Sequence, residues 1–250
     1  MRAAIVTGAS RNIGLAIATR LLDDGWNVCL TGRDEQAVTA AANTLTETHS
    51  AESIRWFAGD IGVESEVRRL VDQVESDWGA VDAVVNNAGI RAHGPIESMT
   101  VQNWDAVLAT VLTGAFLTTR AVLPAMRERG WGRIVNIAGM SGQSGAAGRT
   151  PVIAAKSGLI GLTKACAHEA AGSGVTVNAV SPGLIDTERR PGLGDSNVAA
   201  EHYRHLGDAG NPVGRVGTVE DIAGTVSYLC GPDAGYVTGQ VISVNGGAYM

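Results

Sequence analysis

The chain has little proline, little cysteine and no excess of positive charge. Its 250 residues include 7 prolines and 3 cysteines, and the net charge is −6. The negative charge disfavours a nucleic-acid partner. Cys29, Cys166 and Cys230 lie far apart in apolar stretches. Their spacing fits neither a disulfide framework nor a metal site, so we expect three reduced core residues.

A long hydrophobic run near the first residue is also missing. The first apolar run covers four residues, Ala3–Val6, and ends at a glycine-rich turn. Such a run is too short for a signal peptide or a membrane span. We therefore expect a cytoplasmic protein that does not associate with a membrane.

Glycine and apolar residues, by contrast, are plentiful. The 33 glycines and the 45% of hydrophobic residues indicate tight turns around a full core rather than disorder. Short apolar runs, typical of strands buried on both faces, alternate with stretches of helical periodicity. The pattern predicts one α/β domain over residues 1–250, a Rossmann-type doubly wound parallel sheet flanked by helices. The predicted strands are Ala3–Val6, 28–30, 81–85, 134–137, 175–180 and Val241–Val244.

The first predicted strand runs into the turn 7–14, TGASRNIG, and then into an apolar helix. A strand–turn–helix unit of this kind points backbone N–H groups and the positive end of the helix dipole at a pyrophosphate. Asn12 stands where a third glycine is usual. Because asparagine tolerates a positive φ, we expect the turn to persist. The predicted phosphate-binding residues are Gly8, Ser10, Arg11, Asn12, Ile13 and Gly14.

The second predicted strand is followed by Thr31, Gly32 and Arg33, without an acidic residue to bind a ribose 2′-hydroxyl. Arg33, together with Arg11, is instead placed to bind a 2′-phosphate, which favours NADP(H) over NAD(H). The alternative interpretation is that both arginines are solvated surface residues.

With these motifs, the chain resembles the short-chain dehydrogenase/reductase family over essentially its whole length. The resemblance rests on TGASRNIG, on Asp60, on the segment NNAG at 86–89, on PGLIDT at 182–187 and on TGQVISVNGG at 238–247. It implies that Asp60 meets the adenine, that Thr187 lies near the nicotinamide and that Lys156 binds the nicotinamide ribose. Together, the cofactor-binding residues that the resemblance implies are Asp60, Ile61, Asn87, Ala88, Gly89, Lys156, Pro182, Gly183, Ile185 and Thr187.

The resemblance fails at the family's other catalytic side chains. Beside the lysine, the family uses a tyrosine as general acid, a serine that holds the carbonyl oxygen and an asparagine that serves a proton-relay water. The corresponding positions are Val152, Gly139 and Val111, whose side chains carry no proton to transfer. The loss of a general acid lowers the reaction rate by a factor of about 10²–10⁴, so ordinary ketoreduction is expected to be impaired.

Other residues near the predicted cleft could carry the proton. Ser141 lies two residues past the vacant serine position, although it could equally bond within a turn. The aperiodic segment 186–216 is interpreted as a substrate lid and contains further proton carriers. The candidates are Lys156, Ser141, His93, His202, Tyr203 and His205.

Arg149, Thr150 and two of the histidines have simpler interpretations. Thr150 is expected to cap the helix that starts at Pro151, and Arg149 to be a surface residue. The histidines at 202 and 205 have no third ligand beside them, so no metal is predicted.

Two helices predict self-association. The stretch Val101–Arg129 is apolar on more than one face, and the helix after Val152 is rich in small residues. A helix that is apolar on two sides must be covered twice, so we expect a homo-oligomer. The resemblance implies a tetramer, and a dimer or pairing with a homologous subunit are the alternatives.

Three functions remain open from the sequence. The first is an NADP(H)-binding enzyme whose repurposed site converts a small carbonyl or hydroxyl compound, by a redox or redox-neutral reaction. The second is a catalytically silent subunit that pairs with an active homologue. The third is a slow residual oxidoreductase in which Lys156 and water transfer the proton. Without the phenol and the hydroxyl, the pocket is expected to be roomier and less polar.

Overall fold

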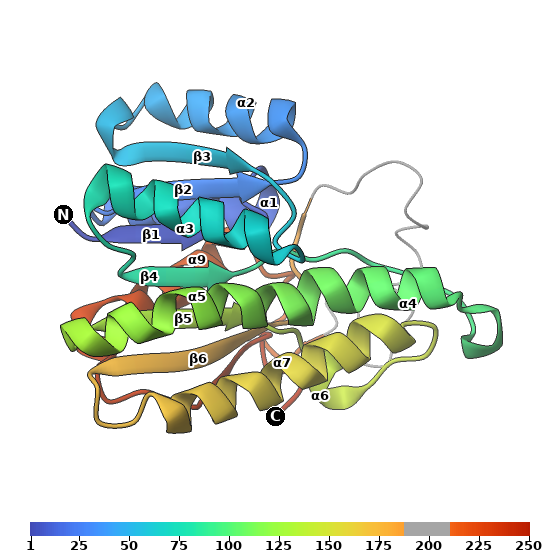
Figure 1. Ribbon diagram of the computed structural model, residues 1–250. Coiled ribbons are helices and arrows are strands. Elements are labelled where there is room, and N and C mark those ends of the chain that lie inside the picture. The colour runs from blue at the N-terminus through green and yellow to red at the C-terminus, as the bar shows by residue number, and fades with distance from the viewer. Residues whose placement is uncertain (188–210) are drawn as a thin grey trace.

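Seven parallel strands form one sheet at the centre of the molecule (Figure 1). The computed structural model describes residues 1–187 and 211–250. The strand order is β3-β2-β1-β4-β5-β6-β7, a doubly wound parallel sheet as the sequence predicts. The strands are β1 (Ala3–Val6), β2 (Asn27–Gly32), β3 (Ile54–Ala58), β4 (Ala83–Asn86), β5 (Gly132–Ile137), β6 (Val175–Pro182) and β7 (Val241–Val244).

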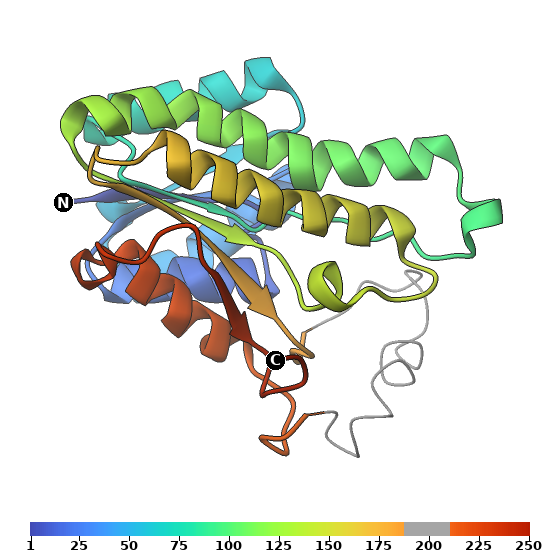
Figure 2. The same cartoon turned by 90° about the horizontal axis from the view of Figure 1, so that it is seen from below.

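Helices cover both faces of the sheet (Figure 2). Alternate residues of β1 serve the two layers: Ala4 and Val6 pack in the core beneath α1, α2 and α9, whereas Ala3 and Ile5 pack beneath α3, α5 and α7. The helices are α1 (Asn12–Asp23), α2 (Glu35–Thr46), α3 (Glu64–Trp78), α4 (Val101–Leu108), α5 (Gly114–Arg129), α6 (Ser141–Ser144), α7 (Thr150–Glu169) and α9 (Val219–Cys230), with short 3-10 helices at Ala51–Ser53, Ile96–Ser98 and Pro232–Ala234.

The three cysteines lie in this core, as the sequence predicts. All are buried and form no disulfide. Burial raises the pKa of the Cys29 and Cys230 thiols to about 12, so both remain protonated at neutral pH.

One strand lay outside the predicted apolar runs, and one predicted helix cap was wrong. Strand β3 was not among the predicted apolar runs, because it lies at the edge of the sheet and Arg55 and Trp56 are only half-buried. Thr150 does not cap α7: the helix already includes it, Arg149 occupies the N-cap, and no side chain there accepts a hydrogen bond. The proline at the start of α7 fixes the backbone without a capping side chain.

The stretch Val101–Arg129 is continuous, as predicted, but a π-helical turn, η3 (Ala109–Thr113), separates α4 from α5. The helix is long and apolar enough to cross a membrane by length and composition alone. Of its most apolar 18-residue window, 56% is buried within the molecule, which is typical of a core helix. The π turn places a local widening of the helix beside the carboxyl ends of the strands.

Candidate active site

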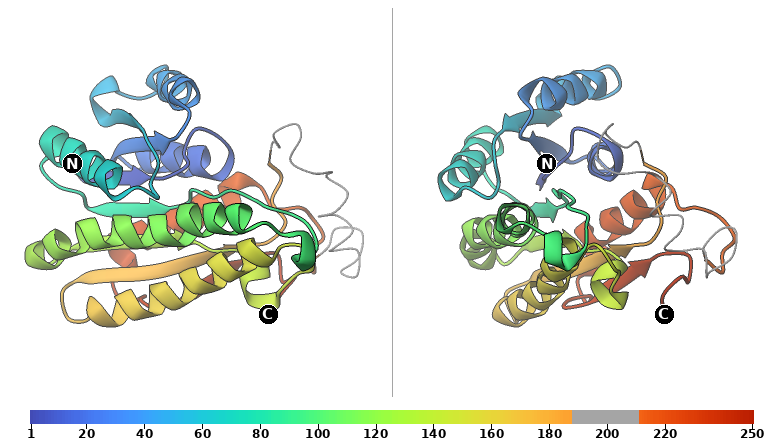
Figure 3. Two further views of the ribbon diagram at one scale, coloured as in Figure 1. Left: turned by 45° about the vertical axis from the view of Figure 1, so that its right-hand side comes forward. Right: turned by 90° about the vertical axis from the view of Figure 1, so that its right-hand side faces the viewer.

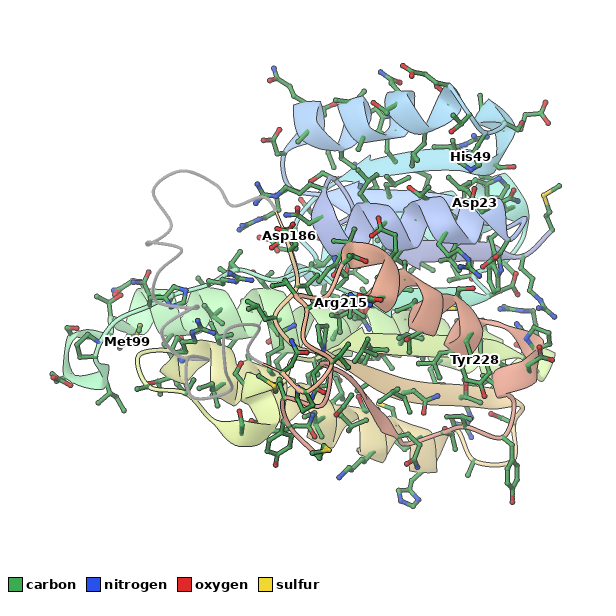
Figure 4. The ribbon with its side chains drawn as sticks, turned by 180° about the vertical axis from the view of Figure 1, so that it is seen from behind. Asp23, His49, Met99, Asp186, Arg215 and Tyr228 are labelled. Atoms are coloured by element: carbon green, nitrogen blue, oxygen red, sulfur yellow. The ribbon has the colours of Figure 1, made fainter. Side chains whose placement is uncertain are left out.

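The candidate residues gather at the carboxyl ends of the strands, which face the viewer in the right-hand view of Figure 3. The strand order reverses between β1 and β4, and open α/β sheets bind ligands in the crevice outside this point. In Figure 4, Asp186 lies at this end of the sheet, whereas Asp23 and His49 lie at the opposite end. The site is therefore assembled from the loops that follow β1, β2, β4, β5 and β6.

The turn after β1 has the geometry that a phosphate-binding turn requires. Gly8 has a φ of +64°, and a Cβ there would lie 2.8 Å from the Cα of Ala88. A Cβ on Gly14 would lie 2.3 Å from the carbonyl oxygen of Gly8. Asn12 has a φ of 51°, so the predicted positive φ is confirmed. The N-cap residue Arg11 provides no side-chain acceptor, which leaves the start of α1 suited to a bound anion.

The loop after β4 locks this turn in place. The Thr7 hydroxyl accepts hydrogen bonds from the backbone N–H groups of Asn87 at 2.9 Å and Ala88 at 3.0 Å. The Asn87 amide donates in return to the carbonyl oxygens of Thr7 and Gly8. The predicted residues Asn87 and Ala88 thus hold the turn by hydrogen bonds. Gly89 lies next to Val111 of the π turn, since a Cβ on Gly89 would lie 3.8 Å from the Val111 side chain.

The loops after β2 and β3 bring Arg33 and Asp60 together at the predicted adenine end. The Arg33 guanidinium lies 4.0 Å from the Asp60 carboxylate, and both side chains remain substantially exposed. The backbone of Asp34 continues into α2, and its carboxylate caps that helix by accepting the Ala37 N–H. Because the Asp34 carboxylate is used as a helix cap, Arg33 is the charged residue after β2 that can face a ligand at this end of the crevice.

Ile61 and Ser10 complete this end. A Cβ on Gly114 would lie 2.7 Å from the Ile61 side chain, so Ile61 packs closely on the start of α5. Ser10 lies beside Gly32, where a Cβ would be 3.9 Å from the Ser10 Cβ.

The segment after β6 closes the opposite side of the crevice. The Gly183 N–H donates to the Val244 carbonyl at 3.0 Å, and Ile185 pairs with Gly217. These contacts hold the segment from Pro182 to Thr187 at the carboxyl edge of the sheet, where the sequence placed it.

Lys156 extends from α7 toward the end of β5. Its ammonium donates to the carbonyl oxygen of Ile137. Burial, and to a lesser degree the positive charge of Arg91, lower the pKa of Lys156 to about 8. A lysine with such a pKa is mostly protonated at pH 7 yet releases a proton more readily than an exposed lysine.

The surroundings of Lys156 are apolar at three positions. Val152, one helical turn earlier, packs with Ile90 against a cluster that contains Val111. Val111 is buried within the π turn. Gly139 faces open space, because a Cβ there would meet no atom within 4 Å. The site therefore has room at Gly139 and hydrocarbon at Val111 and Val152.

The other predicted proton carriers are placed less closely. Ser141 begins α6, which packs on Lys156 through Gly142. His93 lies exposed in the loop before α4. His202, Tyr203 and His205 lie outside the described residues. Within residues 1–187 and 211–250, no three metal-binding side chains gather in one place.

Sequence reasoning missed two features of the site. Arg91 acts on Lys156 from the loop after β4, and no pattern in a loop reveals such a neighbour. A buried polar chain also supports the crevice: the Asn86 amide donates to Asn136 at 2.9 Å, and Asn136 donates to Thr163 of α7 at 2.9 Å. Asparagines inside apolar runs were the available signal for this chain.

The fold defines a doubly wound α/β protein, and its turn after β1 at the switch point of the sheet has the geometry of a phosphate-binding turn. A family model described as "Enoyl-(Acyl carrier protein) reductase" matches residues 8–249. The chain belongs to the short-chain dehydrogenase/reductase family, a family of oxidoreductase enzymes.

Its relatives cover the whole chain. An acetoacetyl-CoA reductase from Rhizobium meliloti is 39% identical over 100% of this chain and 99% of its own length. A 3-oxoacyl-[acyl-carrier-protein] reductase from Staphylococcus epidermidis is 38% identical over the same shares. The crystal structure of a putative gluconate dehydrogenase from Agrobacterium tumefaciens superposes with a TM-score of 0.90 at 32% identity, covering 99% of this chain and 95% of that one.

Proposed function

We propose that the protein is an NADP(H)-dependent oxidoreductase that interconverts a small carbonyl compound and its alcohol, with Lys156 as the proton carrier. The observation that carries the proposal is the partly buried ammonium of Lys156, whose pKa is lowered to about 8 beside Val152. The names of the relatives, which are reductases or dehydrogenases, favour a redox reaction over a redox-neutral one. We also propose a cytoplasmic location, in keeping with three buried thiols.

The residues at the crevice fit the cofactor. The close approach of Gly8 and Gly14 to their neighbours and the uncapped start of α1 suit a pyrophosphate, and Arg33 suits a 2′-phosphate. When bound, the nicotinamide supplies or accepts the hydride.

The chain's own part in the reaction is to hold the carbonyl compound and to move one proton. The ammonium of Lys156 has three N–H groups and uses one of them on Ile137, so another can donate to the carbonyl oxygen of the substrate. Val152 and Gly139 add neither a proton nor a hydrogen bond. Compared with a site that has a dedicated acid, the rate is expected to be lower by about 10²–10⁴.

A fluorescence titration with NADPH and NADH tests the cofactor. NADPH is expected to bind more tightly than NADH, and Arg33→Gln should weaken NADPH binding by roughly tenfold with little effect on NADH. Arg68→Gln is the matched control, since Arg68 is an exposed arginine of α3. Equal binding of the two cofactors by the unaltered protein would refute the NADP(H) preference.

A gain-of-function variant tests the catalytic assignment. Gly139→Ser combined with Val152→Tyr supplies the hydroxyl and the phenol, and the open space at Gly139 accepts the serine. NADPH oxidation in the presence of acetoacetate or acetoacetyl-CoA should rise by roughly 10²-fold or more, and adding Lys156→Met should abolish the gain. NADPH binding without turnover in either form would instead support a silent subunit that pairs with an active homologue.

A further inference from the structure

The turn that follows β5 is joined to the end of β6 at two points. The Met140 N–H donates to the Pro182 carbonyl at 2.9 Å, and the Gln143 carboxamide donates to the Ser181 hydroxyl at 2.7 Å. Gly139 directly precedes Met140 in the chain. The Gln143 carboxamide and the vacant position at Gly139 therefore lie beside the same two residues of β6.

The Ser181 side chain lies on the face of the sheet that α7 covers. Asn136 of β5 donates to Thr163 of α7, so its side chain points to that face. Asn136 pairs with Ala179 of β6, and Ser181 follows Ala179 by two residues. Paired residues of parallel strands, and alternate residues of one strand, point to the same face. The hydroxyl that holds the glutamine is thus on the α7 side of the sheet.

Lys156 reaches the same turn from α7. A Cβ on Gly142 would lie 2.9 Å from the Lys156 Cβ, and the Lys156 ammonium donates to the Ile137 carbonyl. The Gly142 N–H donates to the Gly139 carbonyl at 2.9 Å, so the turn is tight. Along this turn, Gly139 lies between the ammonium at Ile137 and the carboxamide of Gln143.

The Gln143 carboxamide has hydrogen-bonding groups that the fold does not use. A carboxamide has two N–H groups and one acceptor oxygen. Within residues 1–187 and 211–250, the bond to Ser181 is the only hydrogen bond of this side chain. The side chain is only partly buried, and a Cβ on Gly139 would meet no atom within 4 Å. A ligand oxygen therefore has room at Gly139, beside an unused N–H.

We propose that the Gln143 carboxamide binds the carbonyl oxygen of the substrate, in place of the hydroxyl that Gly139 lacks. This inference rests on the proposed function, because it concerns the same site. Ser181 is a positioning residue: its buried hydroxyl accepts one N–H of the amide and leaves the second N–H for the substrate. Lys156 transfers the proton to the oxygen, and Gln143 stabilises the negative charge that develops on it.

Gln143→Leu tests the inference, because leucine is similar in size but forms no hydrogen bond. NADPH oxidation with acetoacetate as the substrate should show a kcat that is lower by roughly tenfold or more, and the affinity for NADPH should be unchanged. Gln240→Leu is the matched control. Its carboxamide is exposed just before β7, at the opposite end of the sheet, so this change should affect neither value.

Two further variants separate contact with the substrate from a structural role. Ser181→Ala should also lower kcat, and it should add nothing to Gln143→Leu, because the hydroxyl acts only through the amide. Gly139→Ser should raise kcat by a larger factor in the Gln143→Leu protein than in the unaltered protein, because both side chains serve the same oxygen. A glutamine that only braces the turn would show neither effect. Thermal unfolding of each variant verifies that the fold is intact.

A second readout does not depend on turnover. Acetoacetate labelled with ¹³C at its keto carbon is bound in the presence of NADP⁺, and the carbonyl resonance is measured by NMR. A hydrogen bond to the oxygen moves this resonance downfield, so Gln143→Leu should move it back upfield. Gln240→Leu should leave it unchanged.

The outcomes distinguish this inference from the proposed function. If Gln143→Leu keeps the kcat and the carbonyl resonance of the unaltered protein, the role of Gln143 is overturned, even where Lys156→Met abolishes turnover. A resonance that depends on Gln143 in a protein that does not reduce acetoacetate supports the contact and overturns the proposed reaction. Acetoacetate that neither binds nor reacts overturns both.

Discussion

Lys156 connects the chemistry of the site to the stability of the fold. Its pKa falls from 10.5 to about 8, chiefly through burial. Between pH 8 and pH 10.5, Lys156 is protonated in the unfolded chain but largely deprotonated in the folded protein. Stability contributed by Lys156 therefore rises with pH from about 8 to 10.5 and is lowest below pH 8, where the folded protein must bury the charge.

Lys156→Met tests this dependence. Urea unfolding across pH 7–10 should show the free energy of unfolding of the unaltered protein rising relative to the variant above pH 8, with a slope of at most about 1.4 kcal/mol per pH unit. Groups that titrate in both proteins cancel in the difference. Parallel pH profiles would mean that Lys156 is solvated in the folded protein.

At the scale of single residues, the sequence predicted the location of most residues that the structure places at the crevice. Lys156, Asn87 and Arg33 could be placed because each follows a motif at a fixed distance. Arg91 could not, since its effect on Lys156 depends on how a loop returns to α7. Val152 and Gly139 could be read as departures, but only the structure shows that one packs in an apolar cluster and the other faces open space.

At the scale of elements, the turn after β1 tolerates no added side chain at Gly14. A Cβ there would lie 2.5 Å from the Asn87 amide nitrogen as well as against Gly8. Gly14→Ala should therefore abolish NADPH binding in a fluorescence titration and lower the free energy of unfolding by about 1–3 kcal/mol. Gly224→Ala in α9 is the control: nothing lies within 4 Å of its Cβ, so it should stabilise the helix by up to about 1 kcal/mol. Equal effects of both changes would contradict the close packing of the turn.

The buried polar chain joins β4, β5 and α7. Asn136 accepts from Asn86 and donates to Thr163, and all three side chains are buried. Asn136→Ala leaves the Asn86 amide without its acceptor, so urea unfolding should show a loss of about 2–4 kcal/mol. Asn103→Ala on the exposed face of α4 should change stability by less than about 0.5 kcal/mol. A small effect at Asn136 would show that water or a rotated amide replaces the lost bond.

Strand pattern explains which elements were predictable. The predicted bounds of β1 and β7 are the observed ones. The predicted start of β5 and the predicted end of β6 lie within two residues of the observed start and end. Strand β3 lacks a continuous apolar run, because one edge of it has no neighbouring strand and polar residues are tolerated there. The π turn in the helix Val101–Arg129 leaves no mark in the apolar spacing, so the sequence predicted one regular helix.

At the scale of the whole molecule, α5 and α7 leave a groove of about 870 Å³ between them. Phe116 on its wall is 42% exposed, with the Arg120 guanidinium 5.0 Å from the ring centre. The groove also carries Arg127 and Glu169, so a two-fold copy could pair opposite charges across it. We propose that a second copy of this chain covers this face, which gives the partly apolar helices the second cover that their pattern predicts.

Sedimentation or light scattering tests the assembly. The protein should have a mass of at least twice 25.7 kDa, and Phe116→Glu should shift it toward the monomer by replacing the exposed apolar ring in the contact with a carboxylate. Val63→Glu introduces the same charge at an exposed position before α3 and should leave the mass unchanged. If the unaltered protein has a mass of 25.7 kDa at micromolar concentration, the proposal of a second copy on this face is refuted. The exposed Phe116 would then fit better with a homologous partner subunit, the alternative that the sequence left open.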